Sequence, residues 1–370
     1  MELVYSGKKK IDVILNNTPQ SKLVGKRDSN NLLIKGNNVY VLQTLRKEYN
    51  LNGKIDLIYI DPPFATNNTF AMGSDRVSTM SMSSSDAVAY TDTLKGDEFI
   101  EFMRERLVLA GELLSGQGSL YVHIDYKIGH YIKIIMDEIF GAENFHNDIT
   151  RIKCNPKNFD RKAFGNIKDM LLFYSKTKSI IWNDPRIPFT ADDRAALFKK
   201  RDSNGRSYTT IPLHAPGETR NGVTGQEFKG IKPPQGRHWR CDPKELEVLD
   251  QQERIEWSSR GNPRKILYAD EQTGKKMQDI WEFKDHPYPV YPTEKNSDLL
   301  KTIISASSNE GSMVLDFFCG SGTTLAAAQV LNRNWIGIDQ SAKAIEVTKN
   351  KLNTITDQYS YLEEADVNSP

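Results

Sequence analysis

Two short apolar segments, far apart in the chain, each end in an aspartate followed by a loop. Residues 55–60 (IDLIYI) precede Asp61, and residues 313–315 (MVL) precede Asp316. Short apolar runs bounded by loop residues are typical of buried strands. In open parallel sheets, ligands bind just beyond the carboxyl ends of the strands. The two aspartates therefore predict a ligand site that is formed where two strands end.

Helical and extended patterns alternate towards both ends of the chain. Further strands are expected at 32–35, 119–124, 169–174 and 335–339, and helices at 38–49, 97–115, 127–140, 295–306, 322–331 and 342–353. Strands that alternate with helices imply parallel crossover connections. We therefore predict an α/β fold with a doubly wound, Rossmann-like, mostly parallel sheet.

The middle of the chain loses this alternation. Residues 182–290 are rich in Pro, Gly and basic residues, and only 243–252 has a plain helical pattern. We predict that 182–290 form an inserted, irregular α+β region, and that residues 1–181 and 291–370 together form the sheet domain. The polar residues 356–370 are expected to be irregular.

One long segment beside the first aspartate also lacks periodicity. Residues 65–96 contain runs of Ser, Asn and Met with no regular apolar spacing. Loops of this length in compact domains are usually functional or disordered. The segment is therefore expected to be either a mobile loop over the site or a disordered insert.

The charge of the chain is unevenly distributed. The formal net charge is +1, but residues 151–240 carry 19 Lys and Arg against 8 Asp and Glu, a local net charge of +11. A basic segment within a neutral protein indicates a polyanionic partner such as nucleic acid. The alternative is a lysine-rich face that only contacts solvent.

The cysteines and the hydropathy exclude several protein classes. Cys154, Cys241 and Cys319 are scattered, which favours neither a disulfide framework nor a zinc site. A cytoplasmic location and no bound metal are expected. No apolar run approaches the roughly 18 residues that a membrane-spanning helix needs, so no membrane partner is expected.

The loop after the second aspartate has the composition of a nucleotide-binding turn. Gly320 and Gly322 permit backbone angles closed to other residues, and the helix that follows directs free N–H groups towards this turn. Asp339 ends the next predicted strand, where nucleotide-binding folds place a carboxylate for ribose hydroxyls. Leu325 stands where a dinucleotide site would have its third glycine. The pattern therefore predicts an adenosine-containing ligand that has no pyrophosphate.

The loop after the first aspartate is stiff and suits a flat, amino-bearing substrate. Asp61 is followed by Pro62, Pro63 and Phe64. Prolines lack an N–H, so the carbonyls of Asp61 and Pro62 are free to accept from a ligand. A carboxylate and a carbonyl can together hold an exocyclic NH₂ group while Phe64 stacks on its ring. The alternative is a proline-stiffened strand exit whose aspartate only caps the backbone.

These two loops together resemble those of a known enzyme family. Residues 61–64 (DPPF) and 316–324 (DFFCGSGTT) are similar to the paired motifs of the β group of amino-methylating DNA methyltransferases, which use S-adenosylmethionine. Residues 291–296 (YPTEKN) and 33–38 (LIKGNN) resemble two further cofactor segments of that group. Residues 214–222 (HAPGETRNG) resemble the middle region of modification subunits of type III restriction systems and of their stand-alone relatives.

The resemblance implies roles for individual residues. The target base would be bound by Asp61, Pro62, Pro63 and Phe64. The cofactor would be contacted by Asn37, Asn38, Lys295, Ser297, Asp316, Phe317, Cys319, Gly320, Ser321, Gly322, Thr323, Thr324 and Asp339. Within that set, Lys295 and Ser297 would lie at the cofactor carboxylate and Asp339 at its ribose. The basic region would supply DNA contacts, with the candidates Arg186, Arg201, Arg206, Arg220, Arg237 and Arg240.

The resemblance also implies an activity and its partners. In this family, Asp at the first position of the catalytic motif goes mainly with adenine N6, and Ser with cytosine N4. The expected enzyme is a site-specific adenine-N6 methyltransferase that acts on a base extruded from double-stranded DNA. A homodimer and a separate restriction subunit are compatible with this assignment. The alternatives are methylation of RNA, of a protein glutamine or of cytosine N4, or a catalytically silent DNA-binding subunit.

Overall fold

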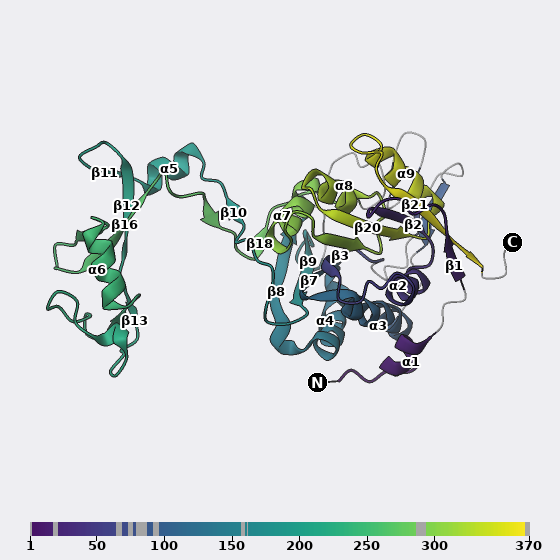
Figure 1. Ribbon diagram of the computed structural model, residues 1–370, viewed down its shortest axis with the longest axis horizontal. Coiled ribbons are helices and arrows are strands. Elements are labelled where there is room, and N and C mark those ends of the chain that lie inside the picture. The colour runs from purple at the N-terminus through teal and green to yellow at the C-terminus, as the bar shows by residue number, and fades with distance from the viewer. Residues whose placement is uncertain are drawn as a thin grey trace. The chain divides into compact units, whose positions relative to one another are not determined.

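The chain is described by a computed structural model, which covers residues 2–17, 21–63, 69–72, 77–78, 87–91, 96–156, 160, 162–285 and 294–366. Contacts within the chain divide it into two compact units (Figure 1). The sheet unit comprises Met1–Pro185 and Gln278–Pro370, and the inserted unit comprises Arg186–Met277. Among the described residues, no helix is both long and apolar enough to cross a bilayer.

A ten-stranded sheet forms the centre of the sheet unit. Its order is β1-β21-β2-β20-β19-β3-β7-β9-β8-β18. The strands are β1 (Ser21–Val24), β2 (Leu32–Lys35), β3 (Ile55–Ile60), β7 (Leu114–Ile124), β8 (Phe145–Ile152), β9 (Lys168–Ser175), β18 (Ile280–Trp281), β19 (Met313–Asp316), β20 (Asn334–Asp339) and β21 (Ser360–Asp366). All neighbours from β21 to β7 pair in parallel, whereas β1 and β9 run antiparallel to their neighbours. The mostly parallel α/β sheet predicted from the sequence is therefore confirmed.

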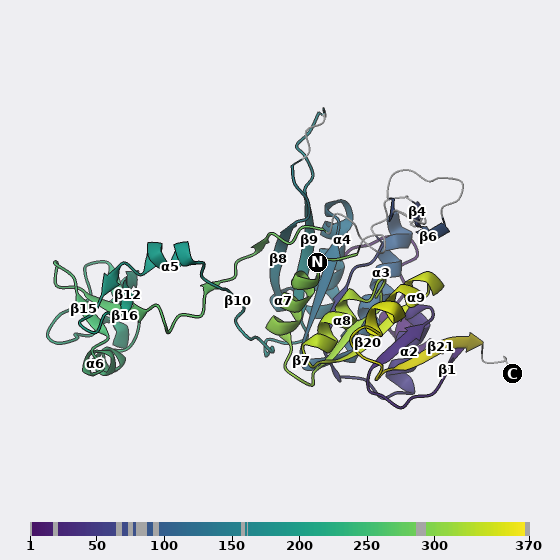
Figure 2. The ribbon, with the colours of Figure 1, turned by 90° about the horizontal axis from the view of Figure 1, so that it is seen from above.

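Helices cover both faces of this sheet (Figures 1 and 2). One face carries α2 (Asn38–Lys47), α3 (Gly96–Leu113) and α4 (Tyr126–Phe140), and the other carries α7 (Ser297–Ser307), α8 (Thr323–Val330) and α9 (Ala342–Leu352). The short helix α1 (Ile11–Asn16) packs on α3. This arrangement is the doubly wound form expected of strands that alternate with helices.

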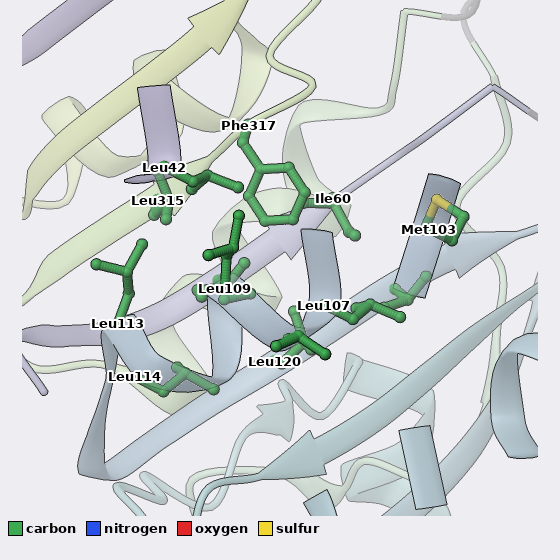
Figure 3. Packing of buried hydrophobic residues seen from close by; sticks show 14 of the residues in the cluster. Leu42, Ile60, Met103, Leu107, Leu109, Leu113, Leu114, Leu120, Leu315 and Phe317 are labelled. Carbon is green, nitrogen blue, oxygen red and sulfur yellow. The ribbon is translucent and has the colours of Figure 1, made fainter. Parts of the chain in front are cut away.

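The core under α2 and α3 holds the end of β19 in place. Figure 3 shows Leu42 of α2 and Leu109 of α3 directed towards the side chains of the strands, with Phe317 beside them. Phe317 follows β19 directly and is fully buried. The loop that starts after Asp316 is therefore anchored in the core by its first side chain.

The two predicted strand ends are direct neighbours. Strand β19 pairs in parallel with β3, with Val314 opposite Leu57 and Leu315 opposite Ile58. Because parallel strands end at the same edge, Asp61 and Asp316 emerge on the same side of the sheet. The two distant parts of the chain thus fold side by side, as the sequence predicted.

The sheet differs from the prediction in several places: strands β1, β8 and β18 were not predicted at all. Strand β7 begins at Leu114, directly after α3, although residues 115–118 (SGQG) have the composition of a turn. The expectation that 356–370 are irregular is wrong for Ser360–Asp366, which form β21 between β1 and β2. Pairing to both neighbours satisfies the backbone of β21, and Leu362 contributes its side chain to the core.

The inserted unit is small and built from short elements. Strands β11 (Lys200–Arg201), β12 (Ser207–Pro212), β16 (Pro263–Tyr268) and β15 (Ile255–Trp257) form one sheet in that order, and β13 (His214–Pro216) pairs with β14 (Arg237–Trp239). Strand β10 (Arg186–Ile187) pairs with β17 (Lys275–Lys276), and the helices are α5 (Ala191–Leu197) and α6 (Pro243–Gln251). A small buried cluster of four side chains, Leu213, Phe228, Trp239 and Leu246, lies within it.

The segment 65–96 is only partly described. Strands β4 (Thr69–Met72), β5 (Val77–Ser78) and β6 (Ala87–Thr91) form a three-stranded antiparallel sheet in the order β5-β4-β6. The remaining residues up to 95 lie outside the described residues. Whether the segment covers the site stays a prediction.

Candidate active site

A cavity of about 340 Å³ lies at the carboxyl ends of β3 and β19. Asp61 and Pro63 from the first loop line it, together with Asp316 and Gly320 from the second. Asp339, at the end of β20, completes this side of the wall. The strand-end geometry therefore brings both sequence motifs to a single hollow.

The two carboxylate oxygens of Asp61 have different surroundings. Oδ2 lies 2.7 Å from Nζ of Lys295, whereas Oδ1 is buried and accepts no hydrogen bond from any described residue. A buried acceptor without a donor is costly. Oδ1 is therefore suited to accept from a ligand that enters the cavity. Phe64, expected to stack on the substrate, lies outside the described residues.

The glycine turn has the backbone conformation that its sequence indicates. Gly320 and Gly322 have φ angles of 49° and 72°, in the left-handed region that favours glycine. A Cβ on Gly322 would lie 2.7 Å from Cγ2 of Thr348, so a larger residue would also clash there. Helix α8 begins at the next residue, Thr323, and its first turn borders the cavity.

Asp316 is a buried acid at the floor of the cavity. Its carboxylate accepts hydrogen bonds from Oγ1 of Thr324 (2.6 Å) and from the backbone N–H of Phe318 (3.0 Å). Burial, together with the negative charges of Asp61 and Asp339, raises the pKa of Asp316 to about 7, although these two hydrogen bonds oppose the rise. A ligand that brings a positive charge or a hydroxyl donor would therefore stabilise the ionised form.

Asp339 links the glycine turn to the next strand. Its carboxylate accepts from the backbone N–H groups of Gly320 (2.9 Å) and Ser341 (2.8 Å). Burial raises the pKa of Asp339, and these two backbone donors oppose the rise. The carboxylate is thus held rigidly at the cavity, with lone pairs left over for a ligand.

The cavity contains most, but not all, of the residues that the sequence suggested. Its lining includes Asn38, Asp61, Pro63, Lys295, Asp316, Phe317, Cys319, Gly320, Ser321, Thr323, Thr324 and Asp339. It does not include Pro62, Gly322, Asn37 or Ser297. Asn37 instead caps α2 by accepting from the N–H of Val39, and Ser297 is exposed at the start of α7.

The family model described as "DNA methylase" matches residues 55–350, most of the chain and both loops of this cavity. The chain belongs to this DNA methylase family. Among the curated relatives, the type II methyltransferase M.EcaI of Enterobacter cloacae is 43% identical over 305 residues, covering 81% of this chain and 65% of the relative. The StyLTI Mod subunit of a Salmonella typhimurium type III restriction-modification enzyme is 26% identical over 363 residues, covering 88% and 54%.

This DNA methylase spans less than two thirds of the length of either relative. The PvuII DNA methyltransferase, described as cytosine-N4-specific, is 11% identical, with a TM-score of 0.48 over 89% of this chain and 90% of that one.

Several cavity residues of this DNA methylase were missed by the sequence analysis. Arg106 of α3 lines the wall, where its Nε donates to Oδ1 of Asn38 (2.7 Å) and one terminal nitrogen donates to the carbonyl of Phe102 (2.8 Å). Burial lowers the pKa of Arg106 to about 9. The available signal was an arginine four residues after Phe102, on the apolar face of a helix.

A second missed group ties the cofactor turn to the C-terminal helix. Nζ of Lys351, on α9, donates to Oε1 of Glu294 (2.6 Å) and to Oγ1 of Thr323 (2.9 Å). These contacts join three segments that are distant in the sequence. Sequence spacing alone carries no signal for such a cluster.

A buried polar chain lies next to the cavity wall. Tyr59, which lines the cavity, contacts Nδ1 of His123 through its hydroxyl (2.8 Å), and Nε2 of His123 lies 3.3 Å from Oδ2 of Asp169. Burial lowers the pKa of His123, and the charge of Lys295 lowers it further. The complete burial of His123 fits a neutral member of this buried chain.

The arginines proposed for DNA contact differ in how they are engaged. Arg206 pairs with Asp270 and Glu271 and lies 3.8 Å above the ring centroid of Tyr268. Arg237 and Arg240 have no acidic partner in the described part of the chain. They contact His214 instead, at 3.1 Å from Nδ1 and 3.3 Å from the carbonyl.

The other three arginine candidates, Arg186, Arg201 and Arg220, are exposed. Aromatic side chains near the arginine candidates in the sequence could stack on bases, but Trp239 is fully buried in the inserted unit and is not available to a base. Tyr208 is partly buried and donates to Glu256. Trp182 stays accessible, with 47% of its surface exposed.

Proposed function

We propose that this chain is a site-specific DNA methyltransferase that transfers a methyl group from S-adenosylmethionine to the N6 amino group of adenine. The observation that carries the proposal is the shared cavity. It contains both the cofactor-type glycine turn and Asp61, whose Oδ1 is buried and has no hydrogen-bond donor among the described residues. Membership of the DNA methylase family supports the reaction class.

The residues of the cavity fit this cofactor. Bound S-adenosylmethionine supplies an electrophilic methyl carbon on a positively charged sulfur. Asp316 offers a buried carboxyl group to an ammonium, and Asp339 offers one to ribose hydroxyls. The three acidic side chains Asp61, Asp316 and Asp339 also make the cavity favourable to a cation. We include in this proposal the cofactor contacts that the sequence predicted for the other residues of the cavity wall.

The first loop would orient the target amine. Oδ1 of Asp61 would accept one N–H of the amino group, and Phe64 would stack on the base. The carbonyl of Pro62 would accept the other N–H, which requires this carbonyl to face the cavity that Asp61 and Pro63 line. This geometry directs the nitrogen lone pair at the methyl group, and most of the rate then comes from positioning. The amino proton leaves to water. An adenine within a duplex reaches such a pocket only when it is extruded, at a cost of a few kcal/mol.

Double-stranded DNA would be held by the basic region and read by 182–290. Within the inserted unit, Arg237 and Arg240 are good candidates for phosphate contact, because they lie together beside His214 and no described carboxylate neutralises them. Burial and these two arginines lower the pKa of His214, a sign of uncompensated positive charge. Arg186, Arg201 and Arg220 remain candidates, whereas the guanidinium of Arg206 is already paired.

The proposal extends to the setting of the enzyme. Relatives named as type II methyltransferases and type III Mod subunits suggest a role in restriction–modification in the cytoplasm. In such a role, the chain could pair with a second copy of itself or with a restriction subunit.

The test is transfer of a labelled methyl group to duplex DNA, RNA and protein in parallel, followed by nucleoside analysis. N6-methyladenine in duplex DNA alone is the expected product. N4-methylcytosine as the product would show that the target is cytosine and not adenine. Label in RNA or in protein glutamine would show that the substrate is not DNA. DNA binding without any product would show a catalytically silent subunit.

A further inference from the structure

The asymmetry of the Asp61 carboxylate points to a second residue that acts on the reaction. Lys295 Nζ lies 2.7 Å from Oδ2, and both side chains are largely buried, with 10% and 15% of their surfaces exposed. Oδ1 of the same carboxylate is buried without a donor from the described residues. One oxygen is therefore occupied and the other is left to a ligand.

Lys295 is held in place from both sides along the chain. The next residue, Asn296, caps α7 by accepting from the N–H groups of Asp298 (2.8 Å) and Leu299 (3.2 Å), and its amide donates to the carbonyl of Lys284. The preceding residue, Glu294, accepts from Lys351. Helix α7 itself is buried through its apolar face. The ammonium therefore approaches Asp61 from a fixed backbone.

The charges around the cavity favour a cation at this position. Asp61 shares the cavity wall with the carboxyl groups of Asp316 and Asp339, and the charge of Asp61 contributes to the raised pKa of Asp316. A positive charge on Lys295 offsets this repulsion. The same charge reaches the buried chain behind the wall, where it contributes to lowering the pKa values of His123 and Asp169.

We propose that Lys295 is a positioning residue for Asp61, which occupies Oδ2 and thereby fixes Oδ1 as the acceptor for the target amino group. This inference rests on the proposed methyl transfer. A charge-assisted hydrogen bond of this length restricts the rotation of the carboxylate. Without it, either oxygen of Asp61 can turn away from the amine, and the aligned complex is less populated.

This role differs from the one expected from the sequence, in which Lys295 binds the carboxylate of the cofactor. The two roles predict that different quantities change when Lys295 is replaced. A lysine that positions Asp61 affects the rate of the bound complex, whereas a lysine that holds the cofactor affects cofactor affinity.

The experiment compares Lys295→Met, which removes the charge, with Lys295→Arg, which keeps it. Lys301→Met is the matched control, because Lys301 lies on α7 in an exposed pair with Asp298. We expect Lys295→Met to lower the single-turnover rate by about 10- to 100-fold at saturating cofactor and DNA. Its cofactor Kd should stay within about twofold of wild type. Lys295→Arg should recover part of the rate, and Lys301→Met should change neither quantity.

A double-mutant comparison separates positioning from a structural effect. In the Asp61→Asn background, Lys295→Met should cause little further loss, because its target carboxylate is already gone. Full additivity of the two losses would overturn the proposal. So would a weakened cofactor Kd with an unchanged single-turnover rate, which would return Lys295 to the cofactor carboxylate. Thermal unfolding of each variant shows whether it is folded.

The proposed function fails separately from this inference. If wild-type protein transfers no methyl group to DNA, RNA or protein, the methyl transfer itself is wrong, and the positioning role falls with it. If wild type is active and Lys295→Met is equally active, only the positioning role is wrong.

Discussion

The two units of this chain maintain their structures by different means. In the sheet unit, one large cluster of buried apolar side chains joins α2, α3 and α4 to the strands, and it includes no residue of the inserted unit. In the inserted unit, the corresponding cluster consists of Leu213, Phe228, Trp239 and Leu246. Around Tyr268, stacked arginines and ion pairs supplement it, with Arg206 and Arg254 both bonded to Glu271.

The difference shows where each kind of functional residue can be placed. A large core holds backbone ends to fixed positions, as the strand ends that carry Asp61 and Asp316 require. A small unit with a charged surface is suited to present cations to a polyanion. The pKa values of acidic groups also differ between the two units. Burial raises the pKa of Asp316 to about 7, whereas Arg254 and Arg206 lower the pKa of the exposed Glu271 to about 2.

Asp61→Ala tests whether the sheet unit alone carries the chemistry. We expect methyl transfer to fall by about 10²–10⁴-fold or more, because the amine loses its acceptor. The cofactor Kd, measured by calorimetry, should change little, since the glycine turn and Asp316 remain. Activity equal to wild type would show that Asp61 is not part of the reaction.

Trp239→Ala tests whether the inserted unit depends on its small cluster. Replacing a fully buried tryptophan costs about 3–5 kcal/mol, which is large for a core of this size. We expect protease cleavage within 186–277 and loss of DNA binding, while cofactor binding persists. Val248→Ala is the control, because Val248 lies on α6 of the same unit and is 50% exposed. Loss of cofactor binding together with DNA binding would show that the units do not fold separately.

Asp316→Asn tests whether burial in the sheet unit raises the pKa of Asp316. A carboxyl group whose pKa is raised by folding stabilises the protein fully below its unfolded pKa, and this contribution is lost as pH rises to about 7. Wild type should therefore lose stability relative to the variant between pH 5 and 7, by up to about 1.4 kcal/mol per pH unit. Thermal unfolding across this range measures the difference. A constant difference would mean that the pKa of Asp316 is not raised.

Neutralising Arg237 and Arg240 together tests the charged surface of the inserted unit. We expect DNA affinity to fall about tenfold and the slope of log K against log salt to flatten by roughly 2, as for two lost phosphate contacts. The matched control is Lys229→Gln with Lys232→Gln, because each of these exposed side chains already pairs with an acidic residue, Asp250 or Glu227. If the control pair changes the slope and the test pair does not, the DNA surface lies elsewhere in the unit.

Much of the sheet unit followed from local pattern. Strands 32–35 and 55–60 were predicted with the bounds that the structure shows, because parallel strands buried on both faces are continuous apolar runs. Strand β21 was missed because its sequence, SYLEEAD, is polar and its position depends on partners far away in the chain. The start of β7 was missed because two glycines in SGQG are typical of a turn.

The site also has features that the sequence predicts and features that depend on tertiary packing. The closeness of Asp61 and Asp316 follows from a rule about strand ends, so the sequence was sufficient for it. The Lys295–Asp61 pair depends on where the first residues before α7 lie relative to β3, and that is set by tertiary packing. Arg106 could have been found as a charge on an apolar helix face, whereas Lys351 could not.

The pairing of β10 with β17 has a consequence for how specificity can change. Arg186 lies opposite Lys276, so the chain enters and leaves the inserted unit at neighbouring points. An inserted unit from a homologue could replace this one without altering the register of the surrounding strands, provided that its two ends lie as close together. Under the proposed function, in which this unit reads the DNA, exchange of this one segment between homologues would give a new recognition sequence to an unchanged methyl-transfer centre.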